Sequence, residues 1–311
     1  MDLDISVSVL IPVFNGENYL NQTIESVLSN TDPSTTELIV INDGSSDKTE
    51  SICLKHIDKL SYISQENKGE FAATNNGLSK ARGKYVMVIS HDDPMLSPEL
   101  IPKAIEILDN NSDIVCVYPD WQIIDAEGKI LTKKIVNEYS EEELIGKFNC
   151  LPGPGAVFRK KEALEIGGRK KWKFVSDYDF WLRLSRLGKF KRIPGVRAQW
   201  RSHQNSTTVS MKSFDMAHER VTVIENFLST NEVDSKIARM GKSSAYYFAA
   251  RLGVFSSEIP AKKWMFFSFL TRRGWPEVAK PLVVLFIFML PFSKHLLKLV
   301  KPFSKRLKDV F

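Results

Sequence analysis

The chain has 311 residues, and its hydrophobic content of 43% is ordinary for a globular protein with one large domain and an appendage. The three cysteines are widely spaced and form no Cys-x-x-Cys pair, so we expect a reducing compartment and neither a disulfide scaffold nor a zinc site. Acidic residues stand near the first residue where a signal peptide would carry basic ones, and we expect no secretion.

The net charge of +6 is unevenly distributed along the chain. Residues 261–311 contain 11 Lys and Arg but only 2 Asp and Glu, whereas the remaining residues carry a slight acidic excess. Such an asymmetry indicates nucleic acid or a membrane surface as the partner of the C-terminal segment.

Apolar runs and helical patterns alternate in the first part of the chain. The runs typical of buried strands are at 7–14, 37–43, 85–90 and 114–120. Helical patterns follow the first two runs, at 17–30 and 47–59. Strands and helices that alternate at this spacing predict βαβ units and a parallel sheet.

Two adjacent carboxylates, Asp92 and Asp93, come just after the strand predicted at 85–90. Open α/β sheets bind ligands at the carboxyl ends of their parallel strands. Paired carboxylates there suit a divalent cation that holds a diphosphate. These residues therefore predict a nucleotide-sugar site.

The second half of the chain continues with a loop rich in Pro and Gly at 151–158. An amphipathic helix is predicted at 177–188 and ends at Gly188, and further helices are predicted within 214–258.

The C-terminal segment has an amphipathic pattern. Its uncharged run at 281–292 is too short to cross a bilayer, because a spanning helix needs roughly 20 residues. Beyond this run apolar residues recur every three or four positions, and the opposite helical face carries five lysines: Lys294, Lys298, Lys301, Lys305 and Lys308. The pattern predicts a helix in an anionic membrane interface, and a terminal helix docked on its own domain is the alternative.

Several segments, read in order, carry a resemblance to a known family: VSVLIPVFNGEN, DGSSD, NKGEFAATNNG, SHDD, LPGPGAVFR, SDYDFWLRL and WRSH. Together they resemble the family 2 inverting glycosyltransferases that build bacterial polysaccharides or lipid-linked glycans. The resemblance covers about residues 5–205. It implies an α/β fold of the GT-A type, with a Rossmann-like, mostly parallel sheet and flanking helices, to which a helical C-terminal membrane-associating tail is added.

The resemblance also implies a division of the chain into segments. A GT-A catalytic domain is expected at 1–210, with a nucleotide-sugar half at about 1–120 and an acceptor half at about 121–210. A helical closing segment is expected at 211–260, and the basic amphipathic tail at 261–311.

Members of this family hold the nucleotide against the first turns of the sheet. The donor-binding residues that the resemblance implies are Pro12, Asn15, Glu17, Asp43, Asn67, Asn75, Asp92 and Arg201. Asp43 matches the acidic residue that contacts the base, often uracil, since a carboxylate can accept a hydrogen bond from a pyrimidine N3–H. An Asx-turn or capping role is the alternative, and we assign that role to Asp47.

The metal motif departs from the family's usual Asp-x-Asp-Asp pattern, because Ser90 stands at the first acidic position. The resemblance implies that Asp93 or Asp92 binds Mg²⁺ or Mn²⁺, with Asp93 preferred and the other carboxylate holding the ribose or ordering the site. Arg201 and His203 are expected to reach the diphosphate or its metal, and a structural histidine is the alternative.

The catalytic base of the family precedes a Trp-Leu-Arg helix. Asp177 fills that position, and we expect it to take the proton from the acceptor hydroxyl. Asp179 is expected to favour the positive end of the same helix. On the acceptor side the resemblance implies Gly153, Gly155 and Arg159, and a plain connecting loop is the alternative.

The resemblance implies a hexosyl- or N-acetylhexosaminyltransferase that moves one sugar, with inversion, from a nucleotide sugar to a glycan or lipid-linked acceptor. UDP is preferred as the nucleotide by resemblance alone. The Gln-x-x-Arg-Trp signature of processive synthases is absent, which favours transfer of a single sugar. We expect a peripheral protein at the cytoplasmic face of the inner membrane, held to anionic lipid by residues 281–311.

Three other functions compete with this one. A catalytically weak or inactive GT-A scaffold that binds sugar is the main alternative, because Ser90 replaces an acidic residue. A nucleotidyltransferase is disfavoured since VFNGEN is not a Gly-rich phosphate loop. A nucleic-acid partner is not expected, because the basic surface is one lysine stripe without a base-stacking motif.

Overall fold

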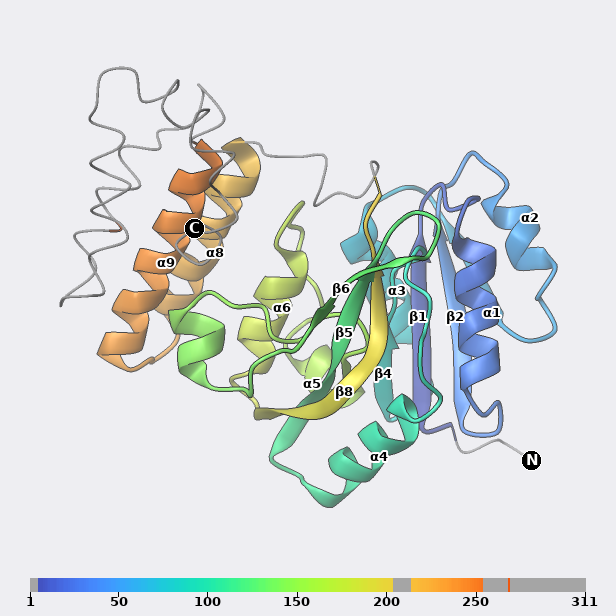
Figure 1. Ribbon diagram of the computed structural model, residues 1–311, viewed down its shortest axis with the longest axis horizontal. Coiled ribbons are helices and arrows are strands. Elements are labelled where there is room, and N and C mark those ends of the chain that lie inside the picture. Colours follow the sequence, from blue (N-terminus) through green and yellow to red (C-terminus); the bar gives the residue numbers. More distant parts are fainter. Residues whose placement is uncertain (1–4, 204–213, 254–267, 269–311) are drawn as a thin grey trace. The chain divides into compact units, whose positions relative to one another are not determined.

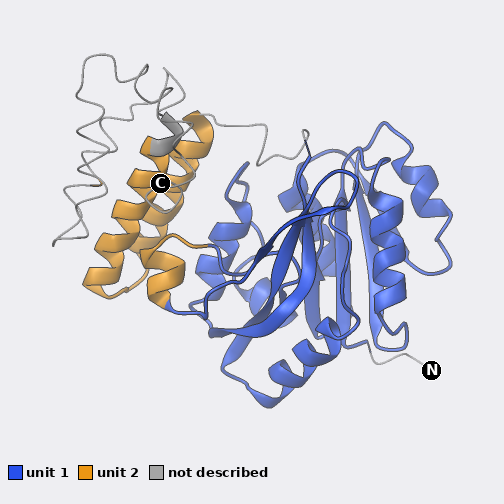
Figure 2. Cartoon of the chain, in the orientation of Figure 1, with its two compact units in different colours: residues 1–140, 150–209 blue, residues 141–149, 210–311 orange. Residues whose placement is uncertain are grey.

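The computed structural model describes residues 5–203, 214–253 and 268. The chain divides into two compact units, drawn in blue and orange in Figure 2. Unit 1 comprises residues 1–140 and 150–209, and unit 2 comprises residues 141–149 and 210–311.

Eight strands in the described part of unit 1 form one mixed sheet in the order β3-β2-β1-β4-β7-β5-β6, with β8 paired to β5 (Figure 1). The strands are β1 (Val7–Val13), β2 (Thr36–Asp43), β3 (Ser61–Gln65), β4 (Tyr85–Val88), β5 (Ile114–Ile124), β6 (Ile130–Lys134), β7 (Val157–Arg159) and β8 (Lys189–Arg201). Strands β1 to β4 run parallel to their neighbours, and β8 runs parallel to β5. Strand β7 is antiparallel to β4 and β5, and β6 is antiparallel to β5.

Helices cover both faces of the central strands. Those of unit 1 are α1 (Leu20–Asn30), α2 (Thr49–Leu54), α3 (Glu70–Lys80), α4 (Leu100–Asn110), α5 (Lys160–Glu165) and α6 (Ser176–Leu184). Side chains alternate along β1, so Val9 and Ile11 join an apolar cluster with Ile24 of α1. On the other face, Leu10 packs beside Gly77 of α3. This double cover explains why β1 is apolar except at Ser8, whose hydroxyl donates to Glu37.

The strand register brings the carboxyl ends of β1, β2 and β4 to one edge of the sheet. Val13 of β1 is paired with Asn42 of β2, and Leu10 is paired with Val88 at the end of β4. Pro12 has no N–H, but the β1–β4 ladder ends before it, so the sheet loses no hydrogen bond there. The turns that follow these three strands therefore lie together at this edge.

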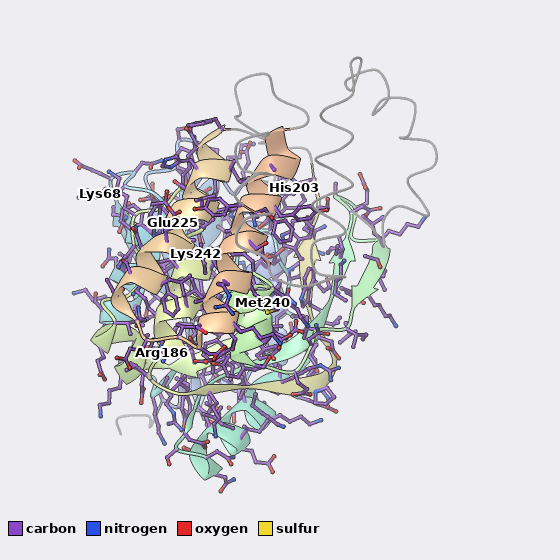
Figure 3. The ribbon with its side chains drawn as sticks, turned by 90° about the vertical axis from the view of Figure 1, so that its left-hand side faces the viewer. Lys68, Arg186, His203, Glu225, Met240 and Lys242 are labelled. Carbon is purple, nitrogen blue, oxygen red and sulfur yellow. The ribbon has the colours of Figure 1, made fainter. Side chains whose placement is uncertain are left out.

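Unit 2 is helical in its described part, which contains a π-helical turn η1 (Glu142–Gly146) and the helices α8 (Phe214–Thr230) and α9 (Ser235–Gly253). A Cβ on Gly241 of α9 would lie 2.8 Å from the carbonyl oxygen of Ile145, so η1 and α9 approach closely at this glycine. Figure 3 labels Met240 on α9 and Glu225 on α8. Met240 packs over η1, and Glu225 accepts a hydrogen bond from Tyr246 of α9.

The tail predicted at 261–311 lies outside the described residues, apart from Ser268. Ser268 is buried in unit 2 and exchanges hydrogen bonds with Ser243 of α9, hydroxyl to carbonyl in both directions, at 3.0 and 2.9 Å. Among the helices that the structure describes, none has the length and apolar character that crossing a bilayer requires.

Candidate active site

Hydrogen bonds join the turns after β1 and β2 into one continuous surface at the carboxyl edge of the sheet, which we call the floor of the site. The Asn15 side chain accepts from the N–H of Ser46 at 2.9 Å, and the N–H of Asn15 donates to the hydroxyl of Ser45 at 2.9 Å. Glu17 donates its N–H to Asp47 at 2.9 Å. Asn15 has a φ of 52°, in the left-handed region that asparagine tolerates better than most residues. The side chains of Asn15 and Glu17 are exposed on this floor.

Asp43, at the end of β2, holds the segment that precedes α3. It is 3% exposed, and its carboxylate accepts from the N–H groups of Lys68 and Gly69 at 2.9 and 2.8 Å. The side-chain amide of Gln65 donates to it at 2.7 Å. Asn67 stays exposed beside this anchor. The structure therefore shows a loop-holding role for Asp43, and its contact with a base stays a prediction.

Asn75 of α3 braces the loop that leads to α6. Its amide donates to the carbonyl of Arg169 at 2.8 Å and accepts from the N–H of Arg169 at 2.8 Å. A Cβ on Gly168 would lie 2.3 Å from the Asn75 side chain, so the loop approaches as closely as a glycine allows. This position does not support the predicted contact with the nucleotide, because both ends of the amide bind backbone.

Asp92 and His203 form a close pair at the carboxyl edge of the sheet. The imidazole Nε2 lies 2.8 Å from a carboxylate oxygen of Asp92, and the two side chains are 13% and 12% exposed. The hydroxyl of Ser90 donates to the other oxygen of Asp92. Burial raises the pKa of Asp92, but the charge of His91 and hydrogen bonds from Ser90 and His203 outweigh it and leave the pKa below its usual value. Asp92 is therefore a charged carboxylate whose two oxygens are both oriented by hydrogen bonds.

Asp93 has the opposite environment. It is 6% exposed, and its carboxylate accepts from the backbone N–H of Arg201 at 2.7 Å. Burial and then the neighbouring charge of Asp92 raise the pKa of Asp93 well above its usual value. Although Asp93 was the preferred metal ligand in the sequence, the geometry favours Asp92, which faces the histidine.

Arg201, predicted to reach the diphosphate, is instead enclosed by the protein. It is 1% exposed and stacks on the ring of Tyr19 with its guanidinium carbon 4.7 Å from the ring centre. Its guanidinium donates to the side chain of Gln22 at 2.6 Å. Sequence reasoning did not single out Tyr19 or Gln22, whose only signal is a three-residue spacing that places them on one helical face.

Asp177 lies exposed in the first turn of α6, where its carboxylate accepts from the N–H of Tyr178 at 2.7 Å. Asp179, two residues later, is buried and paired with Arg183 at 2.6 Å. Arg183 also donates to the carbonyl of Gly168 at 2.8 Å. The two acidic residues of this turn therefore have different surroundings. Asp179 is buried and, through Arg183, fixes the loop before the helix, whereas Asp177 is exposed.

The three residues predicted on the acceptor side do not lie together. A Cβ on Gly153 would lie 2.9 Å from the Trp121 ring, and Gly155, with a φ of 81°, packs against Ala198 of β8. Both glycines precede β7, whose first residue pairs near the carboxyl end of β4. Arg159 pairs with Tyr85 at the opposite end of β4 and donates to the carbonyls of the α4 C-terminus. Its position does not support an acceptor role.

The side chains at this edge of the sheet fit a metal cation that takes only part of its ligands from the protein. Within the described residues, no three His, Cys, Asp or Glu side chains gather as a metal cage. Asp92 and His203 nevertheless offer one carboxylate oxygen and the imidazole Nε2, 2.8 Å apart, and this nitrogen can bind a cation in the tautomer that carries its hydrogen on Nδ1. Mg²⁺ at phosphate sites usually takes one or two protein ligands and completes its shell with phosphate oxygens and water. The pair therefore fits a cation that binds together with a diphosphate.

Comparison with known sequences places this chain in a family. The family model described as "Glycosyl transferase family 2" matches residues 8–164. An uncharacterized glycosyltransferase of Rickettsia prowazekii is 32% identical over 262 residues, which cover 80% of this chain and 79% of that protein. The chondroitin synthase of Escherichia coli is 30% identical over 217 residues, which cover 68% of this chain and 31% of that protein.

Solved structures share the fold at low sequence identity. A fragment of S. aureus TarS in complex with UDP-GlcNAc has a TM-score of 0.68 at 15% identity, over 90% of this chain and 84% of that chain. The mannosyltransferase PcManGT from Pyrobaculum calidifontis, in complex with GDP-Man and Mn²⁺, has a TM-score of 0.58 at 12% identity, over 91% of this chain and 88% of that chain. The expected GT-A α/β fold is confirmed, and the chain belongs to glycosyl transferase family 2.

Proposed function

We propose that this glycosyltransferase moves one sugar, with inversion, from a nucleotide sugar to a hydroxyl of a glycan or lipid-linked acceptor. The observation that carries the proposal is the Asp92–His203 pair at the carboxyl edge of the parallel strands. The TarS and PcManGT structures, which were solved with UDP-GlcNAc and GDP-Man, support a nucleotide-sugar donor in the same fold. UDP is the nucleotide that we propose.

On the donor side, a Mg²⁺ or Mn²⁺ ion held by Asp92 and His203 would neutralise the charge that develops on the departing diphosphate. Ser90 orients Asp92 for this task through the hydrogen bond from its hydroxyl. The floor made by Asn15 and Glu17 lies at the same edge and offers exposed polar side chains to the base and ribose. In this proposal the donor lies across the ends of β1, β2 and β4.

On the acceptor side, Asp177 is the proposed base. It takes the proton of the acceptor hydroxyl as that oxygen bonds to the anomeric carbon, and the bond to the diphosphate breaks on the opposite face, so the configuration inverts. Its exposed place in the first turn of α6 supports this role, because Asp179 in the same turn is already neutralised by Arg183.

The acceptor and the location of the enzyme rest on the sequence. Because chondroitin synthase is among the relatives, a glycan acceptor is consistent with the family match. We further propose that residues 281–311 bind anionic lipid at the cytoplasmic face of the inner membrane, where a lipid-linked acceptor would be reached.

A panel of nucleotide sugars tests the proposal. The protein is incubated with UDP-, GDP- and dTDP-sugars in Mn²⁺, and release of the nucleotide is followed by chromatography. We expect hydrolysis or transfer for at least one UDP-sugar. Binding of UDP without turnover of any sugar would instead favour the inactive scaffold, and neither binding nor turnover would contradict the proposal.

A further inference from the structure

Arg201 is the last residue of β8, and His203 follows it by two residues. The guanidinium is buried, and it donates hydrogen bonds to uncharged oxygens of three separate segments. It donates to the carbonyl of Asp92 at 2.9 Å, to that of Ala126 at 2.9 Å and to the Gln22 side chain at 2.6 Å. These contacts join the end of β8 to the turn after β4, to the β5–β6 turn and to α1.

The backbone of the same residue makes a further link. The N–H of Arg201 donates to Asp93 at 2.7 Å, next to the carboxylate that His203 contacts. The chain is thus fixed on both sides of the Asp92–His203 pair: Arg201 holds the backbone of Asp92 through one carbonyl and the side chain of Asp93 through one N–H. A lysine could not reproduce these contacts, because its ammonium lacks the planar fork of donors.

We propose that Arg201 is a positioning residue that sets the Asp92–His203 pair for metal binding, and that Gln22 of α1 and Tyr19, which precedes this helix, orient the guanidinium. The guanidinium itself is too enclosed to meet the diphosphate. Hydrogen-bonding partners behind metal ligands typically govern affinity by about 10- to 100-fold. The proposal rests on the proposed function only in treating the Asp92–His203 pair as the metal site.

The test is the affinity of the full-length chain for Mn²⁺ in the presence of UDP, measured by electron paramagnetic resonance titration. We expect Arg201→Lys to weaken Mn²⁺ binding by about tenfold or more, and Gln22→Leu by about threefold, with no further loss when the two are combined. Arg197→Lys is the matched control, because Arg197 lies on the same strand but pairs with exposed Glu99. It should bind Mn²⁺ within about twofold of the wild type.

Thermal unfolding of each variant separates positioning from folding. Gln22 is exposed on α1, so Gln22→Leu should fold even if Arg201→Lys does not. If both variants fold and each binds Mn²⁺ within twofold of the wild type, the proposal is overturned and the proposed function stays intact. If Arg201→Lys does not fold, the same result for Gln22→Leu overturns the proposal. Failure of the wild type itself to bind Mn²⁺ with UDP would overturn the metal site and this inference together.

Discussion

Two neighbouring carboxylates at the end of β4 have opposite electrostatic environments. Asp92 receives hydrogen bonds from Ser90 and His203 and has a lowered pKa, whereas the more deeply buried Asp93 has a raised pKa. The difference arises because burial and the charge of Asp92 raise the pKa of Asp93 more than the N–H and the charge of Arg201 lower it, whereas the partners of Asp92 outweigh its burial. This contrast is the reason for preferring Asp92 over Asp93 as the proposed metal ligand.

The base assignment is tested by Asp177→Asn. This change keeps the size and shape of the side chain but removes the proton acceptor, so transfer should fall by about 10²–10⁴-fold. UDP affinity should stay within about twofold, because the proposed donor residues lie on other elements than α6. Transfer rates and calorimetric UDP titrations of the two proteins check both parts. Turnover within threefold of the wild type would dismiss Asp177 as the base.

At the residue scale the sequence identified polar groups better than it identified their partners. Asn75 and Arg201 were predicted to bind the donor, but they bind the protein backbone instead. A motif shows that a position requires a polar side chain, yet either a ligand or an orphan backbone group can impose that requirement. Only the packing of the loop before α6 on Asn75, or of β8 on Arg201, tells the two apart.

Elements were predictable where the hydrophobic period was clear. Strands β1, β2 and β4 have continuous apolar runs because both of their faces are covered, and helix α1 has an apolar stripe. Strands β3, β6 and β8 escaped prediction. β3 and β6 are edge strands with partly or fully exposed patterns, and β8 contains Pro194 and Gly195 at an irregularity in its pairing with β5. The rest of β8 is kept in register by tertiary contacts that no local pattern reveals.

Asp120 of β5 provides one of these contacts. It is 1% exposed and binds Arg192 at 2.7 Å, while the N–H groups of Gly195 and Val136 donate to it at 2.9 and 3.0 Å. Burial alone would raise the pKa of Asp120, but these hydrogen bonds and the charge of Arg192 lower it on balance. One carboxylate therefore joins β5, the irregular part of β8 and the segment after β6.

Asp120→Asn should lower the free energy of unfolding at pH 7 by about 1.5–3 kcal/mol, the usual value of hydrogen bonds to a charged group. The pKa of Asp120 in the folded protein lies below its unfolded value of about 3.8. The stabilisation is therefore complete above the unfolded pKa and is lost as the pH falls through the folded pKa. Urea unfolding at pH 7 and below pH 4 should show the difference between the two proteins shrinking. Glu138→Gln, at an exposed partner of Arg192, is the control. An equal loss at both pH values would contradict the account.

The whole molecule combines a family 2 catalytic unit with a helical unit whose last residues were predicted to bind membrane. Ser268 shows that unit 2 continues past α9, since it is fully buried against Ser243. A test of the tail must therefore leave this contact in place. A chain that ends at residue 280 keeps Ser268 and removes all five lysines of the predicted amphipathic face.

We expect this shortened chain to lose binding to phosphatidylglycerol vesicles, because each lysine near an anionic surface contributes about 1 kcal/mol. Added salt should weaken binding of the full chain. Hydrolysis of the nucleotide sugar should persist, since the predicted donor residues lie before residue 205. Co-sedimentation measures the binding. If both chains bind equally, the tail is a docked helix, and its removal should lower the melting temperature instead.

The central claim is that Asp92 and His203 hold a divalent ion for nucleotide-sugar chemistry. It is tested most directly by the rate at which the preferred nucleotide sugar is turned over in Mn²⁺ and after exhaustive chelation, in the wild type and in Asp92→Ala. We expect chelation to lower the wild-type rate by about 100-fold or more, and Mn²⁺ to restore it in the wild type but not in the variant. Undiminished turnover by the chelated wild type would contradict the account.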